Sequence, residues 1–263
     1  MQEILGKIIP MLITASQEEL VSRFRHVSHT FKADGSLVTE ADLAMQRRMQ
    51  QELQAVWPDY IFLAEEMSQE QQQQLLGNAD KGMWCLDPLD GTSNYAMGIP
   101  FFAASLALIK DGQVQLGGVY DPLRDECFSA IRGVGAWLNG EPLSLDDKQQ
   151  PDQPAIAIID FKRLTPALAA SLVSHPPYKS QRSFGSVALD WCWMAAGRSH
   201  VYLHGQQNIW DYAAGQLIFS EAGGYSSTLE GEAVFSNKLE PRSAVAAVNK
   251  NMFDIWLQRL KAI

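Results

Sequence analysis

The feature that most constrains this chain is an apolar segment that runs into two aspartates three residues apart. Residues 83–86 predict a short buried strand that ends at Asp87, and Asp90 follows across a turn that contains Pro88. Because proline holds such a turn stiff, both carboxylates and the main-chain carbonyl of Leu89 can converge on one point. Hard divalent cations prefer oxygen ligands of this kind. The pattern indicates a metal site, since two aspartates at the end of a buried strand would otherwise repel each other.

The residues after this pair are suited to hold an anion. Gly91 and Thr92 offer backbone N–H groups, and Gly91 has no side chain to block a ligand. If a turn of helix starts here, these amides form a phosphate site beside the metal. Adjacent metal and phosphate sites are what phosphoryl transfer requires. A simple capped turn is the alternative, because Asp, Gly, Thr, Ser and Asn are also common loop residues.

Two other acidic positions strengthen the metal interpretation. Glu65 and Glu66 come at the end of a second predicted strand, residues 60–64. Asp211 stands at the start of a predicted helix, residues 210–222, whose other face is apolar. A lone acidic residue in a first helical turn commonly complements the helix dipole, and this alternative stays open for Asp211.

Composition places the chain among ordinary globular proteins. Its 263 residues are 46% hydrophobic and 19% charged, which suits one large domain or two modest ones. The net charge of −9 argues against a nucleic acid polymer as partner. No run of about 18 apolar residues occurs, so we expect no contact with a membrane interior. Three widely spaced cysteines and the lack of a secretory signal pattern favour a reducing cytoplasm, without disulfides or a zinc cage.

The pattern along the chain predicts a mixed α/β protein, with an α+β first half and an α/β second half. Turn dipeptides at 111–112 and 121–122 predict an antiparallel meander. Residues 69–74, rich in glutamine, predict a loop or an exposed helix. Two prolines within 146–154 mark a boundary, so we expect two halves, residues 1–148 and residues 149–263. The remaining expected helices are 4–24, 40–57, 166–173, 185–196 and 251–260, and the remaining strands are 101–109, 113–120, 126–131, 155–159, 200–203 and 244–248.

Four segments together resemble the inositol monophosphatase family. Residues 86–94 resemble its first signature, and residues 210–215, continuing to Gly224, resemble its second. Residues 64–66 match its Gly-Glu-Glu element with alanine in place of glycine, and residues 36–42 resemble an upstream Asp-x-Val-Thr-x-x-Asp element. The match covers residues 32 to 248 in the family's order. It implies a layered sandwich like that of inositol monophosphatase and fructose-1,6-bisphosphatase, and a homodimer. It also implies that the half of residues 1–148 binds metal and phosphate, and that the half of residues 149–263 completes the site and contacts the substrate alcohol.

The resemblance also implies a set of site residues. Two or three Mg²⁺ ions would be bound, and one of them would activate the attacking water. The implied metal ligands are Glu65, Asp87, the carbonyl of Leu89, Asp90 and Asp211. The implied catalytic residues are Glu65, Thr92 and Asp42, with Asp42 polarising the Thr92 hydroxyl. The implied substrate-binding residues are Gly91, Thr92, Ser93, Gly185, Ser186 and His204. Lys32 and Glu66 lie near positions that support the site in the family, but surface charge explains either equally well.

The implied activity is that of a Mg²⁺-dependent, lithium-sensitive phosphomonoesterase acting on a small polyol or sugar phosphate. The Ser93-Asn94-Tyr95 sequence favours the inositol branch, whereas His204 stands where animal enzymes carry a glutamate that binds ring hydroxyls. Fructose 1,6-bisphosphate, histidinol phosphate and 3′-phosphoadenosine 5′-phosphate therefore remain alternative substrates. A different class of function, a regulatory scaffold that binds proteins and keeps a vestigial metal site, also remains open.

Overall fold

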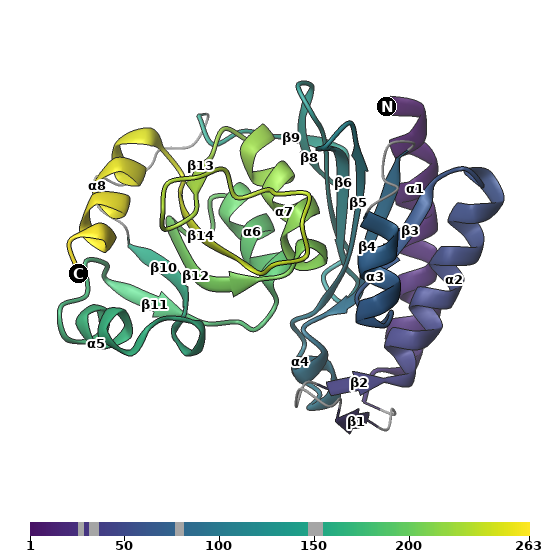
Figure 1. The fold of residues 1–263 in the computed structure, drawn as a ribbon, viewed down its shortest axis with the longest axis horizontal. Helices are drawn as coiled ribbons and strands as arrows, with labels where there is room; N and C mark the ends of the chain where they lie inside the picture. The colour runs from purple at the N-terminus through teal and green to yellow at the C-terminus, as the bar shows by residue number, and fades with distance from the viewer. Residues whose placement is uncertain (26–28, 32–36, 77–81, 147–154) are drawn as a thin grey trace.

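The computed structural model describes residues 1–25, 29–31, 37–76, 82–146 and 155–263, which form alternating layers of helix and sheet (Figure 1). A seven-stranded sheet and a five-stranded sheet lie on either side of the helices α6 (Val187–Ala195) and α7 (Ile209–Glu221). The outer face of the larger sheet is covered by α1 (Gln2–Ala15) and α2 (Glu40–Val56). Beyond the smaller sheet lie α5 (Pro166–Ser174) and α8 (Lys250–Lys261). The expected α/β class is confirmed.

The larger sheet belongs to the first half of the chain and has the strand order β3-β4-β5-β6-β7-β8-β9. β3 and β4 are parallel and the other neighbours are antiparallel. The predicted meander is confirmed as β5, β6 and β7. The strands are β3 (Ile61–Ala64), β4 (Met83–Asp90), β5 (Ala103–Lys110), β6 (Gln113–Asp121), β7 (Glu126–Ile131), β8 (Gly135–Leu138) and β9 (Glu141–Leu143).

The smaller sheet belongs to the second half and has the order β11-β10-β12-β14-β13. β10 is parallel to β11 and β12, whereas β14 is antiparallel to β12 and β13. The strands are β10 (Ile156–Asp160), β11 (Ser180–Arg182), β12 (Val201–Gln207), β13 (Tyr225–Ser227) and β14 (Arg242–Ala247). A separate hairpin pairs β1 (His29–Phe31) with β2 (Leu37–Thr39), and two short helices are α3 (Gln69–Leu76) and α4 (Thr92–Ala96).

The expected opening helix is confirmed, but its second part is irregular. α1 continues directly into a π-helical turn, residues 16–20, and a 3-10 turn, residues 21–23. The glutamine-rich segment is helical, as α3. Within the described residues, no helix combines the length and the apolar character needed to span a bilayer.

The strand that carries the paired aspartates is longer than the sequence pattern predicts. It does not end at Asp87, because β4 continues to pair with β5 as far as Asp90, with a shift in register between the two aspartates. Pro88 has no N–H to donate and falls within this irregular step. Trp84 and Cys85 face opposite cores, since β4 is covered on both sides. This double burial explains why the segment is continuously apolar rather than alternating.

The helix that carries Asp211 lies in the middle of the molecule. α7 is buried on nearly all sides, which fits its place between two sheets. Gly117 on β6 and Gly215 on α7 allow the close approach: an added Cβ would lie 2.8 Å from Cα of Ala214 and 2.7 Å from Cβ of Trp191, respectively. α7 packs directly on the larger sheet, so the second half brings Asp211 to the aspartates of the first. The division at residues 148 and 149 stays a prediction, and residues 147–154 lie outside the described part.

Candidate metal and phosphate site

The acidic side chains gather where β3 and β4 end. The parallel register pairs Ala64 with Leu86, and the N–H of Glu65 donates to the carbonyl of Leu86 at 3.2 Å. Glu65 thus follows its strand beside Asp87. α7 begins across from them and supplies Asp211 in its first turn.

Glu65, Asp87 and Asp211 form the tightest carboxylate group that the described residues contain. One oxygen from each lies within 4.8 Å of the others. Burial raises the pKa of Asp87 and Asp211 well above the usual value, and the negative charges of Glu65 and Asp90 raise both further. A divalent cation removes this repulsion and suits three carboxylate oxygens, so the donor set fits Mg²⁺.

Two of these carboxylates also hold the local backbone. Oδ1 of Asp87 accepts from the N–H of Leu89 at 3.0 Å, which closes the irregular step in β4. Oδ2 of Asp211 accepts from the N–H of Asn208 at 2.8 Å, in a capping box at the start of α7. The helix-start interpretation of Asp211 and its place in the carboxylate group therefore both apply.

Asp90 is bound differently from the other acidic residues. Its Oδ2 accepts from the Ser186 hydroxyl at 2.5 Å and from the N–H of Ala188 at 2.7 Å, at the start of α6. Burial raises its pKa to about 6, although hydrogen bonds from Ser186 and the nearby backbone lower it. Among the described residues, the carboxylates whose oxygens lie within 4.8 Å of one another do not include Asp90. The Ser186 hydroxyl also accepts from the N–H of Leu189 at 3.4 Å, so it is used inside the protein.

The expected pairing of Thr92 with Asp42 is present in the geometry. The Thr92 hydroxyl lies 3.2 Å from Oδ1 of Asp42 and 2.9 Å from the carbonyl of Leu89. Oδ2 of Asp42 accepts from the N–H and the hydroxyl of Thr39, at 2.8 and 2.5 Å, in the capping box of α2. Burial raises the pKa of Asp42 to about 6, and the charge of Glu66 contributes.

The predicted helical turn after Asp90 is confirmed as α4, with Gly91 as its N-cap. Gly91 has φ +92°, and an added Cβ would meet the carbonyl oxygens of Phe101 at 3.0 Å and Gly185 at 3.2 Å. Asn94 donates to the carbonyl of Phe184 at 2.7 Å, which fastens the Gly185 loop to α4. Ser93 is exposed on α4. Lys32 lies outside the described residues.

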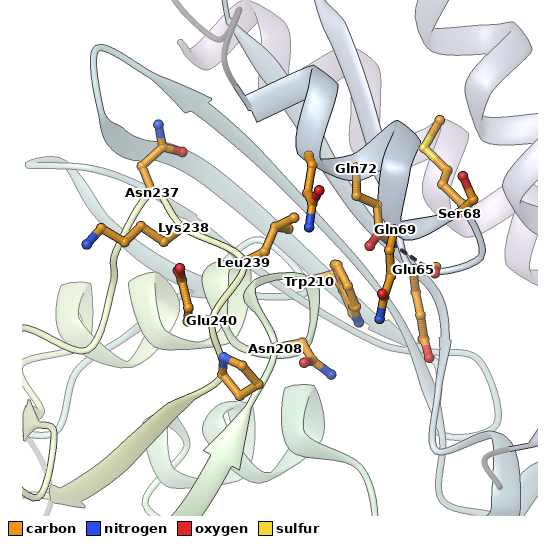
Figure 2. A pocket seen from close by; sticks show the side chains of 13 residues that line it. Glu65, Ser68, Gln69, Gln72, Asn208, Trp210, Asn237, Lys238, Leu239 and Glu240 are labelled. Atoms are coloured by element: carbon orange, nitrogen blue, oxygen red, sulfur yellow. Dashed lines mark hydrogen bonds between the residues drawn. The ribbon is translucent and has the colours of Figure 1, made fainter. Parts of the chain in front are cut away.

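Two cavities meet at Glu65, Asn208 and Pro241. The larger, of about 1120 Å³, is the amide-lined cavity between α3 and residues 237–241 (Figure 2). Gln72 of α3 is buried in its wall and donates to the carbonyls of Ala64 and Glu65 at 3.0 and 3.1 Å, which steadies the end of β3. Trp210 stands between the two walls of this cavity (Figure 2).

The smaller cavity, of about 330 Å³, we call the acidic cavity. It reaches the carboxylate group and extends between β10, β12 and α6. Its walls hold expected site residues together with residues that the sequence analysis missed. Asp160 was detectable in principle, since it follows the predicted strand 155–159 as Asp87 follows its own strand. The expected residues are Glu65, Asp90, Gly185, Ser186, His204 and Asp211, and the missed ones are Asp160, Lys162, Arg163, Ser183 and Asp190.

Comparison with known proteins supports the resemblance. The family model described as "Inositol monophosphatase family" matches residues 5–261. The chain is 36% identical over 201 residues to "Nus factor SuhB" of Pasteurella multocida, covering 74% of this chain and 73% of that protein. It is 31% identical over 229 residues to "Fructose-1,6-bisphosphatase/inositol-1-monophosphatase" of Thermotoga maritima, covering 83% and 85%.

The solved structures agree with these sequence relatives. An inositol monophosphatase structure from Thermotoga maritima superposes with a TM-score of 0.84 at 26% identity, covering 99% of this chain and 97% of that one. The expected layered sandwich is therefore confirmed. The chain belongs to the inositol monophosphatase family and is a phosphoric monoester hydrolase.

Proposed function

We propose that this enzyme is a Mg²⁺-dependent phosphatase that hydrolyses the phosphate monoester of a small polyol or sugar, with inositol phosphate as the model substrate. The observation that supports this most is the convergence of Glu65, Asp87 and Asp211 within 4.8 Å, since Glu65 and Asp211 also line the acidic cavity. A homodimer and inhibition by lithium remain expectations from the family resemblance, and a cytoplasmic location remains an expectation from the cysteines and the N-terminal sequence.

Glu65, Asp87 and Asp211 would hold the metal, together with Asp90 and the carbonyl of Leu89. Bound Mg²⁺ would supply positive charge for the phosphate and lower the pKa of water, as in other metal-dependent phosphatases. Two or three ions stay our expectation. Without them, the buried carboxylates would repel a phosphate ester, because like charges in a buried site interact strongly.

The remaining residues orient the reactants. Asp42 is fixed by Thr39, so its second oxygen is presented to the Thr92 hydroxyl. When Thr92 donates to Asp42, its own oxygen is free to accept from an attacking water. The backbone N–H groups of Gly91 and Thr92 would hold the phosphate oxygens. Glu65 lines both cavities and would receive a proton from that water.

The polar walls of the acidic cavity favour a small leaving alcohol with hydroxyl groups. Fructose 1,6-bisphosphate is the alternative with most support, because the Thermotoga maritima relative carries both activities in its name. Histidinol phosphate and 3′-phosphoadenosine 5′-phosphate are further alternatives. A regulatory role through a protein partner is a second candidate function, because relatives at 34–36% identity are named Nus factors.

Phosphate release from a panel of these esters tests the proposal, in Mg²⁺ and after removal of metal by a chelator. We expect Mg²⁺-dependent release that Asp211→Asn lowers by more than about a hundredfold. Asparagine can still accept the Asn208 hydrogen bond, so the start of α7 is preserved. Asp254→Asn, in an exposed position on α8, is the matched control. Release that does not depend on metal, or that survives Asp211→Asn, would refute the proposal; no release, with a stable protein partner, would favour the regulatory role.

A further inference from the structure

Both ring nitrogens of His204 are used inside the protein. Its Nδ1 accepts from the N–H of Gln206 at 3.3 Å, so the ring proton lies on Nε2. Nε2 in turn lies 3.2 Å from Oδ2 of Asp160. The imidazole is buried and lies in the wall of the acidic cavity. His204 therefore has no ring nitrogen left to bind a substrate hydroxyl, although the family resemblance suggests that role for its position.

Asp160 is the carboxylate that lies beside His204. It is the last residue of β10, and the parallel register sets it directly beside His204 on β12. Its Oδ1 accepts from the N–H of Lys162 at 3.2 Å, and its side chain keeps 20% of its surface exposed in the acidic cavity. Burial works to raise the pKa of Asp160, but the hydrogen bond from His204, together with the charge and the backbone N–H of Lys162, outweighs it and holds the pKa below its usual value. A carboxylate offers about four lone-pair sites, so Asp160 retains capacity to accept from a ligand.

Asp190 on α6 provides a second acceptor in the same cavity. It is only 5% exposed, and its Oδ1 has no hydrogen-bond partner within the described part of the chain. Burial raises the pKa of Asp190 well above its usual value, and the charges of Asp90 and Asp160 add to this. A buried polar atom without a partner is uncommon and calls for a donor from elsewhere.

The charged residues that line this cavity differ in exposure. Lys162 and Arg163 are exposed, whereas Asp160 is half-buried and Asp190 is buried. Acceptors with little access to water select for hydrogen-bond donors on the ligand and against a second anionic group.

We propose that Asp160, positioned by His204, determines specificity by accepting hydrogen bonds from hydroxyl groups of the leaving alcohol, with Asp190 as a deeper acceptor. Asp160 would thus take the place of the glutamate that the family resemblance puts at position 204. The substrate class is then a phosphate ester whose alcohol carries several neutral hydroxyls around the ester carbon. This inference rests on the proposed function.

The test compares two esters with the same ring, inositol 1-phosphate and cyclohexyl phosphate, of which the second has no hydroxyls. Asp160→Asn is expected to lower kcat/KM for inositol 1-phosphate, relative to that for cyclohexyl phosphate, by about tenfold or more. The change should come mainly from a higher KM for inositol 1-phosphate, because a hydrogen bond to a charged group is lost. Asp254→Asn is the control, and thermal unfolding shows whether each variant is folded.

A second pair of variants separates positioning from direct contact. If His204 acts through Asp160, the double variant Asp160→Asn/His204→Ala raises KM no further than Asp160→Asn alone. His204→Gln, which keeps an N–H donor, should restore part of what His204→Ala loses. Multiplied effects of the two single changes would mean that His204 contacts the substrate directly, and would overturn its positioning role.

Calorimetric binding of both esters to wild type and Asp160→Asn keeps this inference separate from the proposed function. Weaker binding of inositol 1-phosphate in the variant, without turnover by either protein, would refute the phosphatase function and leave the specificity role standing. Equal binding and equal KM in the two proteins would overturn the specificity role. If the wild type prefers 2-aminoethyl phosphate to inositol 1-phosphate and Asp160→Asn loses that preference, the assignment of Asp160 to substrate hydroxyls is overturned.

Discussion

The Ser186 hydroxyl donates to Oδ2 of Asp90 at 2.5 Å, across 96 positions of sequence. Asp90 ends a strand of the larger sheet, and Ser186 caps the helix α6 that lies between the two sheets. The bond is buried, so it ties the carboxylate to the helix with little competition from water. This hydrogen bond therefore joins the two halves of the chain beside the carboxylate group.

Removal of this hydroxyl should affect both stability and turnover. Ser186→Ala removes a helix cap and a hydrogen bond to a buried carboxylate, so we expect a loss of about 2 kcal/mol in the free energy of unfolding and a lower kcat. Denaturant unfolding and phosphate release measure the two effects. Thr165→Ala removes the comparable cap of α5, outside the acidic cavity, and should lower stability without lowering kcat. Equal turnover in both variants would contradict a role for this contact.

The stability of the metal-free protein should depend on pH in an unusual direction. Burial raises the pKa of Asp42 and Asp90 from 3.8 to about 6 and raises that of Asp87 and Asp211 well above 3.8. Carboxyl groups with a raised folded-state pKa hold their protons more tightly when the protein is folded. Their contribution to the free energy of unfolding is therefore fully present below pH 3.8. For Asp42 and Asp90, this contribution is lost as pH rises through about 6.

Melting temperatures in chelator and in Mg²⁺ check this expectation. We expect Mg²⁺ to raise the melting temperature more at pH 7.5 than at pH 5, because a cation competes with protons for the same oxygens. Asp211→Asn should remove most of the difference between the two pH values. A larger Mg²⁺ effect at pH 5 would show that the buried carboxylates are not the metal site.

Gly91 should not tolerate a side chain. Gly91→Ala places a Cβ at φ +92° and within 3.0 Å of the carbonyl oxygen of Phe101, so both backbone strain and a clash result. We expect a loss of more than about 2 kcal/mol in unfolding free energy, with a large loss of turnover. Gly112→Ala carries similar strain at φ +69° but meets nothing within 4 Å, so it isolates the strain. If the two variants lose the same unfolding free energy, the close packing around Gly91 does not contribute to stability.

Much of the fold and of the carboxylate group was predictable from local sequence. Apolar runs bounded by turn residues located the central helices and the meander, because buried segments are apolar and the turns between them are not. Glu65, Asp87 and Asp211 were identified because each stands at the end of a strand or the start of a helix within a recognisable motif. The extension of β4 to Asp90 was missed, since pairing with β5 continues past Pro88 although proline suggests a turn.

The acidic cavity is a product of the tertiary structure. Asp160 and His204 are 44 positions apart, and their contact exists only because β10 and β12 lie parallel in one sheet. Both nitrogens of His204 are engaged, and Oδ1 of Asp190 has no partner among the described residues; both facts likewise depend on which segments pack together. The sequence by itself determined the fold class, the family and the carboxylate motifs, because these follow from local patterns. Only the packing of distant segments decided which polar groups are left to face a substrate, because it sets which are satisfied within the protein.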